Sequence, residues 1–283
     1  MTSPLLALPP AIAERFGPRL DAVANTIGPI ADKLGPGPLK DLLSGTWLGH
    51  PLHPVLTDVT IGAWTSAAML DLVGGRRSAR VATTLVGLGV LSAGPTAVSG
   101  WSDWADVEGE ERRVGVAHAM GNSVATVVYG ASWLARRRGY RGLGISLGLL
   151  GAGISSFTAY LGGHLVYDKS VGVDNTTFDR LPAKYTVAMD ADDLAEGAPT
   201  MVEVKGVPVF LLRRGDQVLA LHNTCSHRGG PLHKGELEGD TVVCPWHGSC
   251  FRVADGRLER GPATVPQPSY TARIQDGKVE VRR

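Results

Sequence analysis

Four long segments with little charge dominate the N-terminal part of the chain, and they limit the folds that it can adopt. The segments run roughly over residues 54–73, 81–100, 114–135 and 143–165. Each approaches the length of about 20 residues that a helix needs to cross the hydrocarbon core of a bilayer. The connections between the segments are dense in charge. This pattern predicts a bundle of four membrane-spanning helices.

The composition of the segments bears on how such helices would pack. Glycine, alanine, serine and threonine are frequent, as in the stretch GLGVLSAGPTAVSG at residues 87–100. Small residues let helix backbones approach closely in lipid, so this composition suits a packed transmembrane bundle. A soluble bundle rich in alanine and glycine is the alternative, and the scarcity of charge favours the membrane. We therefore expect a multi-pass protein of the cell membrane, with the lipid bilayer as one partner.

Residues 1–49 precede the first segment and carry less information. Leu20, Val23 and Ile27 follow the spacing of one helical face. The spacing fits either an amphipathic helix on the membrane surface or a helix that packs against other helices. After this surface segment we expect a membrane domain over residues 50–166, a linker over residues 167–183 and a second domain over residues 184–283.

Two arginine-rich connections predict an orientation. They are GGRRSAR at residues 74–80 and ARRRGYRG at residues 135–142. Cytoplasmic loops carry an excess of Lys and Arg, so both connections are expected in the cytoplasm and the C-terminal domain outside. RRRGY at residues 136–140 is a loose match to a twin-arginine export signal. A cytoplasmic C-terminal domain is the alternative, because a module without disulfides suits that reducing compartment.

Four histidines and one aspartate are expected near one face of the predicted bundle. In four antiparallel helices, the starts of the first and third and the end of the fourth lie at the same face. Ionisable residues within a membrane are rare and mark candidate functional sites. One interpretation is a haem b, metal or quinone site, and the other is interfacial histidines that hydrogen-bond loops or headgroups. The residues are His50, His53, Asp58, His118 and His164.

The C-terminal residues follow a different pattern. From about residue 184, short β-branched runs such as VEVKGVPVFLLRR alternate with turn sequences such as RGD at residues 214–216. This spacing of strands predicts a small antiparallel sandwich or barrel. The expected fold class is therefore multidomain, with a four-helix transmembrane bundle followed by a small all-β domain.

Two short boxes interrupt these strands and form a candidate metal site. They are CSH at residues 225–227 and CPWH at residues 244–247. Two thiolates and two imidazoles in the order Cys, His, Cys, His are what a Rieske 2Fe-2S cluster requires, with both cysteines on one iron and both histidines on the other. Tetrahedral zinc uses the same ligand types and is the alternative. Neither Cys250, expected as a small buried residue, nor His222 or His233 is expected to be a ligand.

The C-terminal domain as a whole resembles the Rieske ferredoxins of ring-hydroxylating dioxygenases. CSHRGGPL, CPWHGSCF and the later run GPATVPQP carry the resemblance. It implies that Cys225 and Cys244 hold the inner iron and that His227 and His247 hold the outer one. It also implies that Ser249 donates a hydrogen bond to a cluster sulfide.

Departures from the related respiratory-chain subunits are informative. Those subunits carry a disulfide between two extra cysteines, and this chain has Gly230 and Trp246 at the matching positions. They also carry a tyrosine donor where this chain has Phe251. Hydrogen bonds to the sulfurs raise the reduction potential. One donor retained and one lost predict a potential in the lower part of the Rieske range of about −150 to +300 mV.

The helical region resembles an uncharacterised bacterial family of four-helix membrane domains with no assigned function. The resemblance rests on LGHPLHPVLTDVTIGAW, GWSDW and GGHLVYDKSVGVD, and it extends over residues 46–174. It implies the helical fold and no activity.

These features favour a membrane-anchored one-electron carrier, a component of an oxidoreductase system rather than a self-contained enzyme. Its expected partners are a donor such as quinol or haem and an acceptor protein. A redox-sensing or structural membrane protein is the alternative. An oxygenase needs a further mononuclear iron site, for which the residues after His247 leave no room. A net charge of +1 and the lack of a basic stripe argue against nucleic acid as a partner.

Overall fold

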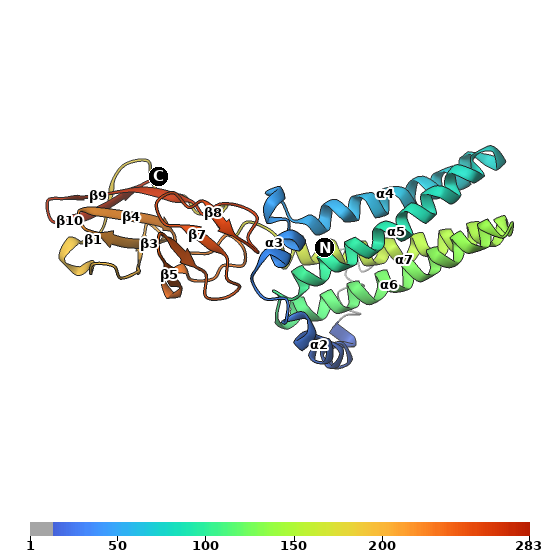
Figure 1. The fold of residues 1–283 in the computed structure, drawn as a ribbon, viewed down its shortest axis with the longest axis horizontal. Coiled ribbons are helices and arrows are strands. Elements are labelled where there is room, and N and C mark those ends of the chain that lie inside the picture. The colour runs from blue at the N-terminus through green and yellow to red at the C-terminus, as the bar shows by residue number, and fades with distance from the viewer. Residues whose placement is uncertain (1–13) are drawn as a thin grey trace, which may run out of the picture. The chain divides into compact units, whose positions relative to one another are not determined.

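The computed structural model describes residues 14–283, so the first part of the predicted surface segment lies outside the described residues. The chain forms two compact units. One contains the residues up to Leu34 together with Leu52–Val171, and the other contains Gly35–Pro51 together with Gly172–Arg283. The elements of both units are labelled in Figure 1.

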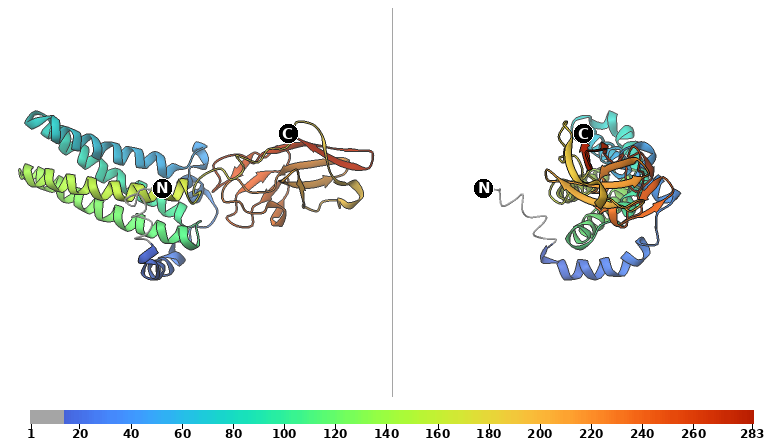
Figure 2. Two further views of the ribbon diagram at one scale, coloured as in Figure 1. Left: turned by 180° about the vertical axis from the view of Figure 1, so that it is seen from behind. Right: turned by 90° about the vertical axis from the view of Figure 1, so that its left-hand side faces the viewer.

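The first unit is helical, and its long helices contain all four predicted segments. α4 packs along α5, and α6 packs along α7, as Figures 1 and 2 show. The prediction of four long helices is confirmed. The elements are α2 (Gly17–Ala31), α4 (Leu52–Val73), η2 (Gly75–Ser78), α5 (Ala79–Trp104), α6 (Gly109–Arg137) and α7 (Arg141–Tyr167).

Glycines allow large aromatic side chains into the centre of this bundle. The rings of Trp64 and Tyr129 stack with their centroids 3.9 Å apart. A Cβ on Gly89 of α5 would lie 2.2 Å from the Trp64 Nε1, and one on Gly151 of α7 would lie 2.8 Å from the Tyr129 ring. Any larger residue at these two glycines would displace the stacked pair. The small residues of the sequence therefore serve close packing of the helices.

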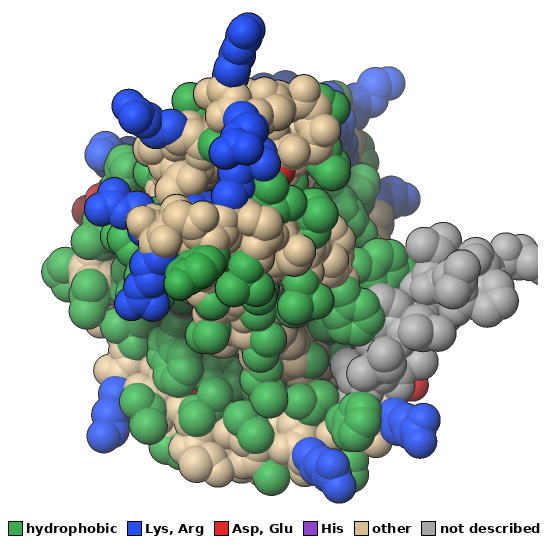
Figure 3. Space-filling view, turned by 90° about the vertical axis from the view of Figure 1, so that its right-hand side faces the viewer, with side chains coloured by type: hydrophobic (Ala, Val, Ile, Leu, Met, Phe, Trp, Pro, Cys, Tyr) green, Lys and Arg blue, Asp and Glu red, His purple; other side chains and the backbone are tan. Residues whose placement is uncertain are grey.

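The outer surface of the bundle is apolar. Among the described residues, two stretches are long and apolar enough to cross a membrane, namely Gly75–Trp104 and Arg141–Tyr167. α4 and α6 contain more polar residues, yet they also expose large apolar side chains, among them Val59, Leu72 and Val127. Figure 3 faces the end of the bundle with the α4–α5 and α6–α7 connections, and it shows Lys and Arg side chains around a broad hydrophobic surface.

α2 packs against the bundle within this unit. Leu20 and Ala24 are buried in a cluster with Trp104 and Leu161. The guanidinium of Arg113 donates two hydrogen bonds to the carboxylate of Asp21, at 2.8 and 2.9 Å. Of the two alternatives for this helix, the packing helix is the one observed.

The second unit contains two antiparallel sheets. The larger has the strand order β1-β10-β9-β4-β3-β2 and the smaller has the order β5-β6-β7-β8. The larger sheet contributes to two apolar clusters, one around Val209 and Leu211 and one in which Phe210 packs with Phe251 of the smaller sheet. The all-β prediction is confirmed. The strands are β1 (Thr186–Asp190), β2 (Thr200–Val204), β3 (Val207–Arg214), β4 (Gln217–His222), β5 (Glu236–Glu238), β6 (Thr241–Val243), β7 (Cys250–Arg252), β8 (Leu258–Arg260), β9 (Ser269–Gln275) and β10 (Lys278–Arg282).

Four short helical elements complete this unit. Two of them come from the N-terminal part of the chain, because residues 35–51 belong to the same compact unit as the β-strands. The packing thus divides the chain differently from the sequence-based boundaries, which assigned these residues to a surface segment. The elements are α3 (Pro38–Ser44), η1 (Thr46–Leu48), η3 (Ala191–Asp193) and η4 (Leu232–Lys234).

Candidate metal centre

Two loops of the same construction present the boxes. The N–H of Cys225 donates to the Gly230 carbonyl at 2.8 Å, and the N–H of Cys244 donates to the Ser249 carbonyl at 2.8 Å. In return, each cysteine carbonyl accepts a hydrogen bond from the glycine four residues later, Gly229 or Gly248. Both of these glycines have a positive φ, 81° and 76°, which is unfavourable for residues with a Cβ. The glycines of the motifs therefore shape the two loops.

The loops bring the two cysteines together and the two histidines together. Cys225 and Cys244 are buried free thiols, 1% and 3% exposed, and their sulfur atoms share a hydrogen bond. His227 and His247 are half-buried, and their rings are perpendicular with centroids 5.1 Å apart. Two sulfurs on the inside and two imidazoles toward the surface match the donor set of a Rieske cluster.

The electrostatics of the site favour the ligating forms of Cys244 and His227, whereas the hydrogen bond to Cys244 and burial raise the pKa of Cys225 well above its usual value. Backbone N–H groups of each box point at its cysteine sulfur, those of His227 and Arg228 at Cys225 and those of Trp246 and His247 at Cys244. The hydrogen bond from the Cys225 thiol is the main cause that lowers the pKa of Cys244 to about 7. Burial is the main cause that lowers the pKa of His227 well below its usual value, and nearby positive charges add to this effect. Neutral imidazoles and hydrogen-bonded thiolates are the forms that bind metal.

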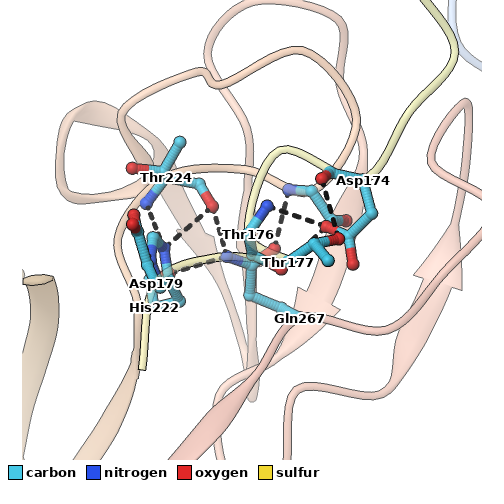
Figure 4. Close-up of polar contacts among 8 residues, drawn as sticks. Asp174, Thr176, Thr177, Asp179, His222, Thr224 and Gln267 are labelled. Carbon is cyan, nitrogen blue, oxygen red and sulfur yellow. Dashed lines mark hydrogen bonds and ion pairs between the residues drawn. The ribbon is translucent and has the colours of Figure 1, made fainter. Parts of the chain in front are cut away.

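A network behind the first box holds it in place (Figure 4). The side-chain amide of Gln267 accepts a hydrogen bond from the Ser226 N–H at 2.9 Å and donates to the carbonyls of His222 and Thr224, at 2.8 and 2.5 Å. His222 is fully buried, and its Nδ1 accepts from the Thr224 N–H at 3.0 Å, so its Nε2 donates to Asp179 at 3.2 Å. Burial is the main cause that lowers the pKa of His222. His222 is therefore a structural residue, as expected.

The predicted linker also supports the first box. Asn175 donates from its side-chain amide to the His227 carbonyl at 2.9 Å, and its N–H donates to the Ser226 carbonyl at 3.1 Å. Asp174 fixes this turn by accepting hydrogen bonds from the N–H and the hydroxyl of Thr176, at 2.9 and 2.7 Å, as Figure 4 shows. Sequence reasoning missed Asn175 and Gln267. Their signal in the sequence was position alone, since Asn175 directly follows the GGHLVYDKSVGVD run and Gln267 lies within GPATVPQP.

The residues around the second box have defined surroundings, and donation from Ser249 to a cluster sulfide stays a prediction. The hydroxyl oxygen of Ser249 accepts the N–H of Ala263 at 3.0 Å, so its hydrogen is available for donation. Cys250 is buried on β7. His233 is held through its N–H and Nδ1 by the side chain of Asn223, at 2.9 and 3.0 Å. Gly230 lies against Trp246, since a Cβ on the glycine would be 3.2 Å from the indole.

Two of the five residues in the speculative second site come together. The rings of His53 and His118 lie at right angles with centroids 6.3 Å apart. Each Nδ1 is hydrogen-bonded to a backbone carbonyl, of Thr96 at 2.9 Å and of Thr158 at 2.8 Å. His118 also contacts the side-chain amide of Asn122, 3.1 Å from its Nε2.

The other three residues lie elsewhere. Asp58 is exposed on α4, because five residues after His53 it has turned by about 140° around the helix. His164 faces Asp168 one turn later, 3.5 Å away. His50 is exposed, belongs to the second unit, and contacts the Pro51 carbonyl. Among the four candidates in the helical unit, the ring contact observed is that between His53 and His118, and the five-residue site stays a prediction.

The C-terminal unit matches known proteins closely. Residues 184–271 match the Rieske 2Fe-2S domain family. Ferredoxin CarAc of Metapseudomonas resinovorans is 36% identical over 92 residues, which are 32% of this chain and 86% of that ferredoxin. The anthranilate 1,2-dioxygenase ferredoxin subunit of Burkholderia cepacia is 34% identical over 90 residues, 32% of this chain and 83% of the subunit.

A solved ferredoxin structure also aligns with part of the chain. The ferredoxin of carbazole 1,9a-dioxygenase from Nocardioides aromaticivorans IC177 is 29% identical and aligns with a TM-score of 0.33, covering 35% of this chain and 97% of that one. Residues 49–175 match a family described as predicted membrane protein, DUF2231.

These findings give the site its cofactor. The donor set fits a Rieske-type 2Fe-2S cluster, which carries one electron at a time, and the relatives are ferredoxins. The zinc alternative is set aside. The chain therefore belongs to the Rieske 2Fe-2S family through its C-terminal domain, while its helical region matches the model of a predicted membrane protein family.

Proposed function

We propose that this protein is a membrane-anchored electron carrier, which takes electrons from a donor in the membrane, such as quinol or a haem b protein, and passes them to a partner protein. Cys225 and Cys244 hold the inner iron, and His227 and His247 hold the outer iron. The observation that carries the proposal is the position of the two imidazoles, half-buried on one side of buried sulfurs. They offer electrons a short route between the cluster and a partner.

The helical unit supplies the anchor. Large apolar side chains project outward from all four long helices, including Leu72 of α4, Leu91 of α5, Val127 of α6 and Leu150 of α7. Extended exposed apolar surface is rare on soluble proteins and is expected where lipid covers it. All four helices therefore cross the bilayer in this proposal.

The arginine-bearing connections support an orientation. Arg141 donates a hydrogen bond to the Gly75 carbonyl at 3.2 Å, so the α4–α5 and α6–α7 connections lie at one end of the bundle. Arg136 is buried within the bundle, so it is not one of the loop arginines on which the orientation depends. With the remaining arginines in the cytoplasm, the C-terminal domain is extracytoplasmic. A fluorescent protein that matures only in the cytoplasm, fused after Arg283, should stay dark. Bright fluorescence there would assign the domain to the cytoplasm instead.

Reduction of the cluster by quinol tests the proposed donor. Purified membranes containing the protein, oxidised and then mixed with a quinol under anaerobic conditions, should develop the EPR signal of a reduced Rieske cluster. Membranes with His227→Ala serve as the control for signals from other proteins. If dithionite reduces the cluster and quinol does not, quinol is not the donor, and haem proteins are tested next.

The hydrogen-bond donors near the cluster predict its potential. Replacing Ser249 with Ala removes a donor that stabilises the reduced cluster, so the midpoint potential should fall. Phe251→Tyr restores the missing hydroxyl and should raise it. An expected size is on the order of a tenfold change in the reduction equilibrium, about 59 mV for one electron. Potentiometry monitored by EPR measures both shifts, and equal potentials in both variants would exclude sulfide donation from these positions.

A further inference from the structure

The four long helices repeat one helical hairpin. α4 and α6 carry residues that meet in pairs at three levels of the bundle, and the two members of every pair are 65 positions apart in the sequence. Because this offset is constant, the two helices run in the same direction, as in parallel repeats that are related by a two-fold axis. The pairs are His53 with His118, Trp64 with Tyr129 and Asp71 with Arg136.

The two hairpins hold their histidines in the same way. The carbonyl of Thr96 in α5 accepts a hydrogen bond from the first imidazole at 2.9 Å, and the carbonyl of Thr158 in α7 accepts one from the second at 2.8 Å. One turn later in each helix, a glycine lies against the ring. A Cβ on Gly100 would be 2.7 Å from the first imidazole, and a Cβ on Gly162 would be 3.0 Å from the second. The threonines and the glycines both recur at an offset of 62 positions, so the histidine environment belongs to the repeat.

These contacts fix the tautomer of the two rings. A carbonyl oxygen can only accept a hydrogen bond, so each neutral imidazole carries its proton on Nδ1 and its lone pair on Nε2. The side-chain amide of Asn122 lies 3.1 Å from the Nε2 of His118 and donates to it, which agrees with this tautomer. Metal-ligating histidines almost always donate their other ring N–H to a carbonyl or carboxylate. Both rings therefore have the tautomer and the support of metal ligands.

The histidine pair differs from the other two pairs, because its members do not complement each other. The aromatic rings of the second pair stack, and the charges of the third pair are opposite. In the first pair each imidazole keeps an acceptor nitrogen, and two acceptors cannot hydrogen-bond to each other. The ring centroids are 6.3 Å apart. This separation is close to the largest that one metal atom can bridge with bonds of about 2.0–2.1 Å to nitrogen, so the two nitrogens would bind it from opposite sides.

We propose that His53 and His118 are the axial ligands of a haem b that binds between the two helical hairpins. A haem iron takes its axial ligands from the two faces of the porphyrin. Within residues 14–283, the hydrogen-bond partners of both rings are uncharged. A bare metal cation would therefore lack the negative charge that its burial requires, whereas the porphyrin brings negative charge to the iron.

The packing of the helices indicates where the porphyrin enters. The contacts within each hairpin are more extensive than those between the hairpins, and both histidine side chains are only half-buried. The porphyrin thus enters between the hairpins, and the Asn122 amide gives up its contact with Nε2. The inference deepens the proposed function, because the haem b donor named there would belong to this chain, but it does not depend on the cluster.

The optical spectrum of the purified full-length protein tests this inference. Titrated with haemin in detergent, the wild type should bind one haem per chain and show the spectrum of low-spin iron with two histidine ligands. His53→Ala and His118→Ala should each lose that spectrum. Imidazole added to either variant should restore it, because the free ligand fills the vacant axial position. His164→Ala is the control, since this histidine of α7 faces Asp168, and its spectrum should equal that of the wild type.

Three results would overturn the inference. They are a wild type that shows only the spectrum of unbound haemin, an unchanged haem spectrum in both histidine variants, and failure of imidazole to restore the spectrum in either variant. The last result would assign the two histidines a role in packing alone. The EPR signal of the reduced Rieske cluster, recorded on the same samples, reports separately on the proposed function. It should be present in the wild type and in all three variants, and its absence would leave the haem result unaffected.

Discussion

The Rieske EPR signal is expected to disappear when either His227 or His247 is replaced by Ala. Each imidazole fills one of two positions on the outer iron, and in the described part of the chain the other nearby histidines already have structural partners. His222 is fixed by Asp179 and Thr224, and His233 is fixed by Asn223. Neither can replace the lost ligand without breaking its own loop. The expected result is therefore complete loss of the signal and not a shift.

His233→Ala is the matched control for this experiment. It removes an imidazole from the segment between the two boxes and leaves the four proposed ligands untouched, so the signal should persist. The wild type and the His233→Ala control should contain the same amounts of iron and acid-labile sulfide. The ligand variants should contain less of each. A full 2Fe-2S signal in His227→Ala or His247→Ala would refute the ligand assignment.

Local patterns explain why so much of the fold could be predicted. Long apolar segments predict the helices, and short β-branched runs between turn residues predict the strands. Each of these patterns can be recognised from residues that are close in sequence. The boxes likewise carry their ligands within a few residues. The glycines Gly229 and Gly248, at positive φ, follow from the same short motifs.

The supporting contacts could not be predicted in this way, because they join residues that are distant in sequence. Gln267 reaches Ser226 across 41 positions, and Asn175 reaches His227 across 52. Asp41 reaches Gly261 across 220 positions, so nothing near residues 35–51 indicated that they pack with the β-strands. The misplacement of Asp58 is different. Its helical phase relative to His53 is readable from the sequence, whereas membrane depth alone does not determine the face of the helix on which a residue lies.

A buried ion pair inside the bundle leads to the second large expected effect. Arg136 of α6 and Asp71 of α4 are 2% and 3% exposed in their side chains. The guanidinium donates two hydrogen bonds to the carboxylate, at 3.0 and 2.5 Å, and a further one to the Ser132 hydroxyl at 3.1 Å. The sequence suggested only that Arg136 belongs to a charged connection. Because both side chains are buried, each charge is compensated by the other.

Replacing Arg136 with Met should lower the free energy of unfolding by about 3–5 kcal/mol, because the Asp71 carboxylate would be left buried without its partner. Asp71→Leu should destabilise by a similar amount for the converse reason. The double variant removes both charges and should recover most of the loss, since paired replacement by apolar residues is often neutral. Arg138→Met, at an exposed position of the same connection, should leave the free energy of unfolding nearly unchanged. Denaturant unfolding in detergent, followed by circular dichroism, measures all four. If the two single losses simply add in the double variant, the two side chains stabilise the bundle independently and not as a pair.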